Sequence, residues 1–172
     1  MAVDLFPPQS SSELTGPEWL RARRATAAAA LSEWDLPTTD LEEWRYSRIR
    51  DLHPERFSTL GGAAEGTAEA GRVPVPAAAI IAELGDLAGV VVVHNGVAVQ
   101  VELAAELEGT GVVFGPAGDA DEGLLGAAID HAPDAFAQLN DAFAPTPVVL
   151  SVPRGTTVEL AFALVSYTDV EG

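Results

Sequence analysis

Apolar residues recur at two different spacings along this chain, and each spacing predicts a different kind of element. The run 19–34 is rich in Ala, and its larger apolar residues recur at helical spacing, at Leu20, Ala27, Leu31 and Trp34. Pro17 suits the first position of a helix, and Pro37 prevents the helix from continuing. We therefore predict a helix from about residue 17 to 34, with Arg21 and Arg24 off its apolar stripe.

A hairpin is predicted over 89–103. The apolar run 89–94 is followed by Asn95-Gly96, the strongest short hairpin signal, because both turn positions need a positive φ. The return strand 97–103 alternates apolar and polar residues. A two-residue turn then predicts one buried apolar face with three facing pairs, namely His94 with Val97, Val92 with Val99, and Val90 with Val101.

Weaker patterns predict the remaining elements. Thr39 and Glu42 have the spacing of a capping box, which favours a short helix there. Further helical turns are expected over 77–84, and strands over 110–114, 148–152 and 158–166. A helix over 134–144 is predicted from three apolar residues on one face, at Phe136, Leu139 and Phe143.

These elements give an α+β chain with four segments. An N-terminal helical region over 1–60, with a mobile lead-in over 1–14, precedes a flexible linker over 61–75 that is rich in Gly, Ala and Glu. An α+β segment over 76–147 holds hairpin 89–103 and helix 134–144. In the last segment, 148–172, the strand over 158–166 is apolar enough to need cover on both faces. We expect the natural protein to continue beyond it and this chain to be an N-terminal fragment.

Composition excludes several classes of protein. The 172 residues carry a formal net charge of −17, with no lysine, so the field of the chain repels phosphate backbones and nucleic acid is not an expected partner. Because there is no cysteine, the chain has no disulfide and no thiolate ligand. No signal peptide and no membrane-spanning run is visible, and we expect a cytoplasmic protein.

Candidate catalytic groups are few. The three histidines, His53, His94 and His131, are far apart in sequence, and none has a metal-ligand partner at short spacing. His131 lies near two carboxylates, and His94 adjoins the hairpin turn. No phosphate-binding loop is present, and no catalytic pair of carboxylates stands out. We expect no catalytic, cofactor-binding or metal-ligating residue in this chain and expect that it is not an enzyme.

The most informative stretch is Glu42-Glu43-Trp44-Arg45-Tyr46-Ser47. Consecutive Trp, Arg and Tyr are unusual in a chain that otherwise prefers Ala, Gly and Val. One interpretation is a packing corner in which Trp44 and Tyr46 bury their rings and Arg45 bridges to a carboxylate or to carbonyl groups. The other is a surface that binds a partner, because these residue types dominate interface hot spots.

Four motifs in order resemble the SufB/SufD family, the scaffold subunits of the bacterial SUF system for iron–sulfur cluster assembly. They are Leu36-Pro37 with the stretch 42–47, the hairpin 91–97, the helix 134–143, which is similar to the family's "LN-x-AF" helix, and the strand 148–152 entering Pro153-Arg154-Gly155. Two places depart from the family pattern, at 144–147 and 160–162. The short N-terminal region and the absence of cysteine favour the SufD branch.

The resemblance implies a larger architecture. It implies an N-terminal helical region, a long right-handed parallel β-helix whose first strands lie in 148–172, and a C-terminal region that docks the ATPase SufC. It also implies SufB as a partner. The family's cluster-assembly residues lie downstream of these positions, so the resemblance assigns no site residue here, and we expect the fragment alone not to hold SufC stably.

Two other functions remain open. The chain is alternatively a self-contained acidic protein-binding domain that grips a partner through Trp44, Arg45 and Tyr46. A small enzyme that uses His94 or His131 with nearby carboxylates is the third reading.

Overall fold

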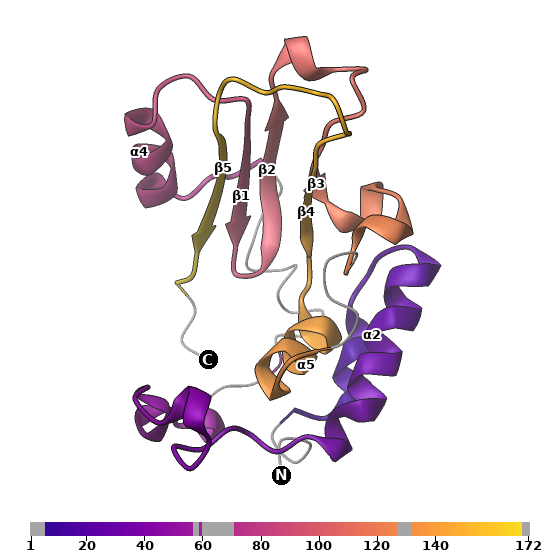
Figure 1. The fold of residues 1–172 in the computed structure, drawn as a ribbon, viewed down its shortest axis with the longest axis vertical. Helices are drawn as coiled ribbons and strands as arrows, with labels where there is room; N and C mark the ends of the chain where they lie inside the picture. Colours follow the sequence, from indigo (N-terminus) through magenta and orange to yellow (C-terminus); the bar gives the residue numbers. More distant parts are fainter. Residues whose placement is uncertain (1–5, 57–58, 60–70, 127–131, 170–172) are drawn as a thin grey trace. The chain divides into compact units, whose positions relative to one another are not determined.

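The described chain forms two compact units. A computed structural model describes residues 6–56, 59, 71–126 and 132–169. Unit 1 comprises the described residues up to 59 together with 132–144, and unit 2 comprises 71–126 and 145–169. Helices and strands both occur, which confirms the α+β class (Figure 1).

The predicted N-terminal helix is present in unit 1. Helix α2 spans Glu18–Ala30 and is followed by the 3₁₀ turn η2, Leu31–Glu33. Pro17 is its N-cap, and Glu18 lies in the first turn. Its buried stripe consists of Leu20, Arg24, Ala27 and Ala28, so the expectation that Arg24 lies off the stripe is wrong. Position 24 falls one turn after Leu20 and one turn before Ala27, which is the inward face of a 3.6-residue helix.

Helix α5, Ala135–Phe143, packs against α2 within unit 1. Asp134 is its N-cap, and its carboxylate accepts a hydrogen bond from the Ala137 N–H at 2.9 Å. The deepest residues of α5 are Ala135, Gln138 and Ala142, whereas the predicted stripe of Phe136, Leu139 and Phe143 is only half-buried. Leu139 and Phe143 nevertheless pack against the buried cluster of Ala27, Ala28, Leu31 and Ala142, so the predicted stripe forms the rim of the contact between α2 and α5.

Residues 6–14, part of the lead-in that the sequence predicts over 1–14, form a turn that packs within unit 1. The 3₁₀ helix η1, Pro8–Glu13, packs against α2, with Ser11 and Leu14 buried. Phe6 contacts Phe143 with ring centroids 6.5 Å apart. Unit 1 also contains three short 3₁₀ turns, which are η3 Glu42–Trp44, η4 Ile49–Asp51 and η5 Pro54–Arg56.

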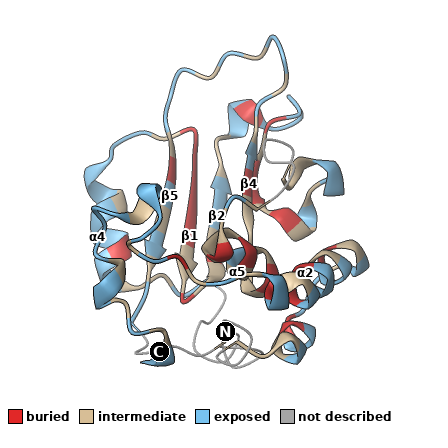
Figure 2. Ribbon diagram, turned by 60° about the horizontal axis from the view of Figure 1, so that its bottom comes forward, coloured by how far each residue is buried: buried red, intermediate tan, exposed pale blue. Residues whose placement is uncertain are grey.

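Unit 2 is built on a three-stranded sheet in the order β2-β1-β5. Strand β1, Gly89–His94, and strand β2, Val97–Leu103, have the predicted bounds and pair antiparallel. Asn95 and Gly96 join them with φ values of 51° and 82°, as the hairpin signal predicts. Strand β5, Phe162–Tyr167, runs parallel to β1 at the other side. Strand β1 is buried along most of its length (Figure 2).

The predicted register of the hairpin holds only next to the turn. His94 faces Val97, but an irregularity between Val92 and Val93 shifts the remaining pairs, so that Val92 faces Gln100 and Val90 faces Glu102. Val99 is the extra residue of this bulge. It stays in the buried cluster with Val90 and Val92, whereas Val101 is 47 % exposed. The predicted pairs Val92–Val99 and Val90–Val101 are therefore wrong.

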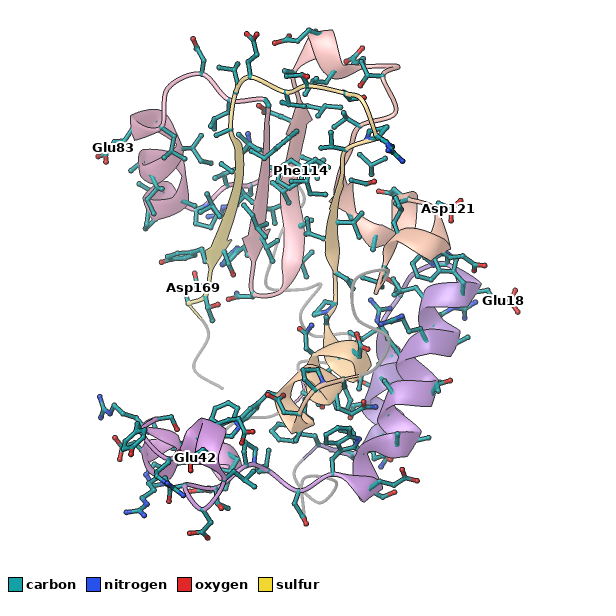
Figure 3. The ribbon with its side chains drawn as sticks, in the orientation of Figure 1. Glu18, Glu42, Glu83, Phe114, Asp121 and Asp169 are labelled. Atoms are coloured by element: carbon teal, nitrogen blue, oxygen red, sulfur yellow. The ribbon has the colours of Figure 1, made fainter. Side chains whose placement is uncertain are left out.

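Two layers cover the sheet. Helix α4, Val75–Glu83, packs on β5, and its Ala77 joins the cluster of Val90, Val92, Val99 and Ala163. A second, two-stranded antiparallel sheet consists of β3, Val113–Pro116, and β4, Val148–Ser151. Phe114 of β3 meets Phe162 of β5 edge to face at 5.1 Å, and Figure 3 shows Phe114 between these strands. The described residues of this unit also form three 3₁₀ turns, namely η6 Ala105–Leu107, η7 Ala117–Asp119 and η8 Glu122–Leu124.

The two C-terminal strands join different sheets. Strand β4 pairs antiparallel with β3, and β5 pairs parallel with β1. The sequence predicts that the second strand begins at Val158, but it begins at Phe162. Residues 156–160 line a hollow of about 460 Å³ and do not pair with another strand. No right-handed β-helix is formed within the described residues.

The units differ in part from the four predicted segments. Helix α5 belongs with α2, although the sequence places 134–144 in the segment 76–147. Of the predicted linker 61–75, only 71–75 is described. There the Gly71 N–H donates to the Val99 carbonyl at 2.8 Å, and Val75 begins α4.

Candidate functional site

The stretch 42–47 forms a 3₁₀ turn and not the expected capped helix. Leu41 precedes η3, and no side chain caps the turn. The Thr39 hydroxyl instead accepts a hydrogen bond from Arg50 Nε at 2.9 Å. That bond uses the oxygen that a capping box would aim at the turn, so the predicted capping box of Thr39 and Glu42 is wrong. Figure 3 shows Glu42 among the side chains of this segment.

Trp44 fixes the segment to the rest of unit 1. Its ring is half-buried and meets the ring of Phe136 on α5, with centroids 5.4 Å apart and planes tilted by 54°. The Trp44 carbonyl accepts from the Ser47 hydroxyl at 2.7 Å, and the Trp44 N–H donates to the Leu41 carbonyl at 3.1 Å. Aromatic pairs of this geometry add to the free energy of burial. Trp44 therefore packs as the corner interpretation predicts.

Arg45 and Tyr46 face the solvent. Arg45 forms an ion pair with Glu42 at 2.6 Å, as the prediction of a bridge to a carboxylate requires, and both side chains are about half or more exposed. Such a surface pair contributes little to stability. Tyr46 is 90 % exposed, so the prediction that its ring is buried is wrong. An exposed Tyr beside a held Arg is a surface that can contact another molecule.

A hollow of about 600 Å³ lies beside Trp44. Its apolar walls come from Trp34, Pro37, Leu41 and Trp44, and its polar groups include Asp35, Glu43 and Asp134. All of these residues belong to unit 1. The hollow joins the segment after α2, the turn η3 and the start of α5.

A second polar cluster lies at the hairpin turn of unit 2. His94 Nε2 is 2.9 Å from Asp169 Oδ1, and Asn95 Nδ2 donates to the same oxygen at 2.9 Å. The Asp169 N–H donates to Asn95 Oδ1 at 3.1 Å, and the rings of His94 and Tyr167 lie 5.6 Å apart. Figure 3 shows Asp169 just beyond the end of β5.

The electrostatics of this cluster follow from its hydrogen bonds. Hydrogen bonds from Asn95 and then His94 hold the pKa of Asp169 below its ordinary value of 3.8, and partial desolvation opposes them. The carboxylate thus orients the His94 ring at the end of β1. The sequence carries no signal for this contact, because Asp169 lies 75 residues after His94 and only the parallel pairing of β1 with β5 joins them.

The other two histidines add no site within the described residues. His53 pairs with Glu55 at 3.2 Å on the surface, and His131 lies outside the described residues. Within 6–56, 59, 71–126 and 132–169, no three His, Cys, Asp or Glu side chains are grouped so that they could hold a metal ion. In the same part of the chain, no helix has the length and apolarity needed to cross a membrane.

Comparison with known proteins assigns no family. No model of a protein family matches this chain, and the search of curated proteins gives no match.

Proposed function

We propose that this chain is the N-terminal part of a non-catalytic scaffold subunit of the bacterial SUF system, of the SufD branch of the SufB/SufD family. It would act in the cytoplasm with SufB and the ATPase SufC in assembling iron–sulfur clusters. The order of four sequence motifs carries the proposal. They fall at η3, at the β1–β2 hairpin, on α5, and at β4 leading into Pro153-Arg154-Gly155.

We also propose that β5 is the first strand of a right-handed parallel β-helix. The Asn95 N–H donates to the Tyr167 carbonyl at 2.9 Å, so the backbone groups of Tyr167 face β1. Since backbone direction alternates along a strand, the N–H and C=O groups of Phe162, Leu164 and Ser166 point to the outer edge. That edge is where a following parallel strand would hydrogen-bond, and the 58 % exposed side chain of Leu164 lies beside it.

Loss of the gene tests the proposal. Deleting it in the bacterium that carries it should lower the activity of an iron–sulfur enzyme such as aconitase, while an enzyme without a cluster stays unchanged. The wild-type gene should restore aconitase activity. Unchanged aconitase in a strain that depends on its SUF system would contradict the proposal.

Complementation also tests the absence of catalysis. Genes carrying His94→Ala or His131→Ala should restore aconitase activity as well as the wild-type gene does, provided that immunoblotting shows equal protein levels. Loss of complementation at a normal protein level would favour a catalytic role for the substituted histidine.

A second candidate is a self-contained acidic protein-binding domain. The 90 % exposure of Tyr46 beside the Arg45–Glu42 pair favours it. In that case Tyr46→Ala would abolish binding to a partner outside the SUF system, and deletion of the gene would leave aconitase unchanged.

A further inference from the structure

We infer that the hollow beside Trp44 binds a basic side chain, with arginine favoured over lysine, presented by a partner protein. The hollow lies within unit 1, and the inference is independent of the proposed SUF function. Three features carry it: two indole side chains in the walls, carboxylates from three separate segments, and the strong negative charge of the chain.

The ring of Trp44 and the backbone of Trp34 are held in place before any ligand arrives. Trp44 is fixed by its ring contact with Phe136 at 5.4 Å. Trp34 follows η2, and its backbone N–H donates to the Leu31 carbonyl at 3.2 Å. Pro37, three residues later, is buried. A cation next to the face of a Trp ring is attracted by the ring quadrupole, and Trp is the best ring for this contact.

The polar groups of the hollow select for positive charge. Asp35, Glu43 and Asp134 line it, and no arginine or histidine does. Asp134 Oδ1 accepts from the Ala137 N–H at 2.9 Å, which holds this carboxylate in position. A guanidinium group can stack on an indole and donate to carboxylates in the same plane, which an ammonium group cannot do. The site therefore favours arginine.

Charge decides between a partner protein and a second copy of this chain. Each copy carries a net charge of −17, so two copies repel one another. A segment rich in Arg is attracted by the same field. We therefore assign the site to a basic segment of a different protein.

Titration with a short peptide tests the site. The probe is the acetylated, amidated peptide Gly-Gly-Arg-Gly-Gly, and its control carries the uncharged isostere citrulline at the central position. We follow the indole N–H signals of Trp19, Trp34 and Trp44 by NMR. The arginine peptide should shift the Trp34 and Trp44 signals saturably and leave Trp19 unchanged, and the citrulline peptide should shift none of them.

Matched variants separate the site from general attraction to an acidic protein. The double substitution Asp35→Asn, Glu43→Gln should weaken binding about fivefold or more, because it removes two carboxylates of the hollow. The control Glu83→Gln, Asp86→Asn changes the net charge equally but lies in the other unit, and it should leave binding unchanged. Asp134 is kept because it caps α5.

Three results would overturn the inference. The first is equal shifts with the arginine and citrulline peptides. The second is equal weakening in both double variants, which would show that only net charge matters. The third is a dimer that forms as the protein concentration rises, seen by sedimentation without peptide. If the indole N–H signals of Trp34 and Trp44 shift as this dimer forms, the hollow binds a second copy of the chain.

Discussion

Arg24 is a fully buried charged residue that joins three parts of unit 1. It lies on the inward stripe of α2 and is 1 % exposed. Its Nη1 donates to the Thr15 carbonyl at 2.7 Å, and its Nε and Nη2 donate to the Ala144 carbonyl at 3.2 and 2.9 Å. A buried charge is tolerated only when its hydrogen bonds are made. Arg24 therefore ties α2 to the chain before it and to the end of α5.

Arg24→Ala should lower the free energy of unfolding by about 3 kcal/mol, because carbonyl groups that accept from a charged donor lose their partner. Urea denaturation measures this change. Arg21→Ala is the matched control, since Arg21 is exposed on the same helix and its loss should cost less than about 0.5 kcal/mol. Equal losses of unfolding free energy for the two substitutions would show that the hydrogen bonds of Arg24 do not stabilise the packing of α2.

Trp44 and Tyr46 should differ sharply although they are two residues apart. Trp44→Ala removes the ring contact with Phe136 and should cost about 2 kcal/mol of stability. Tyr46→Ala removes a ring that is 90 % exposed and should change stability by less than about 0.5 kcal/mol. Thermal and urea unfolding check both values, and a melting temperature unchanged by Trp44→Ala would refute the anchor role.

Asp169 should make stability depend on pH at the acid end. Its pKa is lowered in the folded state, so its carboxylate adds stability above pH 3.8, and this stability is lost as the pH falls through the lower folded-state pKa. Asp169→Asn should therefore be less stable than the wild type between pH 5 and pH 7, and the difference should narrow below about pH 4. Glu83→Gln, on exposed α4, is the control and should show no difference. A constant gap for Asp169→Asn down to pH 3 would contradict this account.

At the scale of elements, the sequence predicts what local chemistry determines. Asn95-Gly96 locates the hairpin, Pro17 caps the start of α2, and Asp134 caps the start of α5. The end of α2 at Ala30 is not predicted, because Pro37 lies seven residues beyond it. The sequence does not predict the bulge at Val99, because the alternation of apolar and polar residues along 97–103 runs through that position without a break. The parallel pairing of β5 with β1 also escapes it, since no local pattern names a partner more than 60 residues away.

Contacts between distant segments also decide which residues of the candidate site are buried. The stretch 42–47 stands out by residue type, but burial separates its members. Trp44 packs because its ring lies against the ring of Phe136 on α5. The ring of Tyr46, in contrast, is 90 % exposed. Asp35 and Asp134, which line the hollow, belong to segments that are adjacent only after α5 has joined α2.

The hairpin turn gives a direct test at this scale. Gly96 has φ +82°, and a Cβ there would lie 2.9 Å from Pro145 Cδ. Gly109 has a similar φ of +74° but no neighbour within 4 Å. Gly96→Ala should therefore lower the free energy of unfolding by about 1–2 kcal/mol more than Gly109→Ala, because both carry the same backbone strain and only Gly96→Ala adds a clash. Equal losses of unfolding free energy in the two variants would show that Pro145 moves to make room for the added methyl group.

At the scale of the whole molecule, the chain alternates between its two units. Unit 1 takes its described residues from both sides of a long stretch of unit 2, so α5 completes the packing of a helix more than 100 residues earlier. Gln138 Nε2 donates to the Ala27 carbonyl at 2.7 Å across this contact. Patterns along the sequence place 134–144 in the segment 76–147, because no local signal indicates that this helix packs on one more than 100 residues earlier.

In the function that we propose, the two units are the opening part of a scaffold that works only in a complex with SufB and SufC. The chemistry would then belong to the assembled complex, and the role of this chain would be structural.

The most direct measurement is capture of the gene product as the cell makes it. The gene is tagged at its chromosomal locus, the protein is purified under gentle conditions, and its partners are identified and quantified by mass spectrometry. The account predicts SufB and SufC in stoichiometric amounts relative to the tagged protein. Recovery of the folded, tagged protein without either of them, from cells that express both, would contradict it.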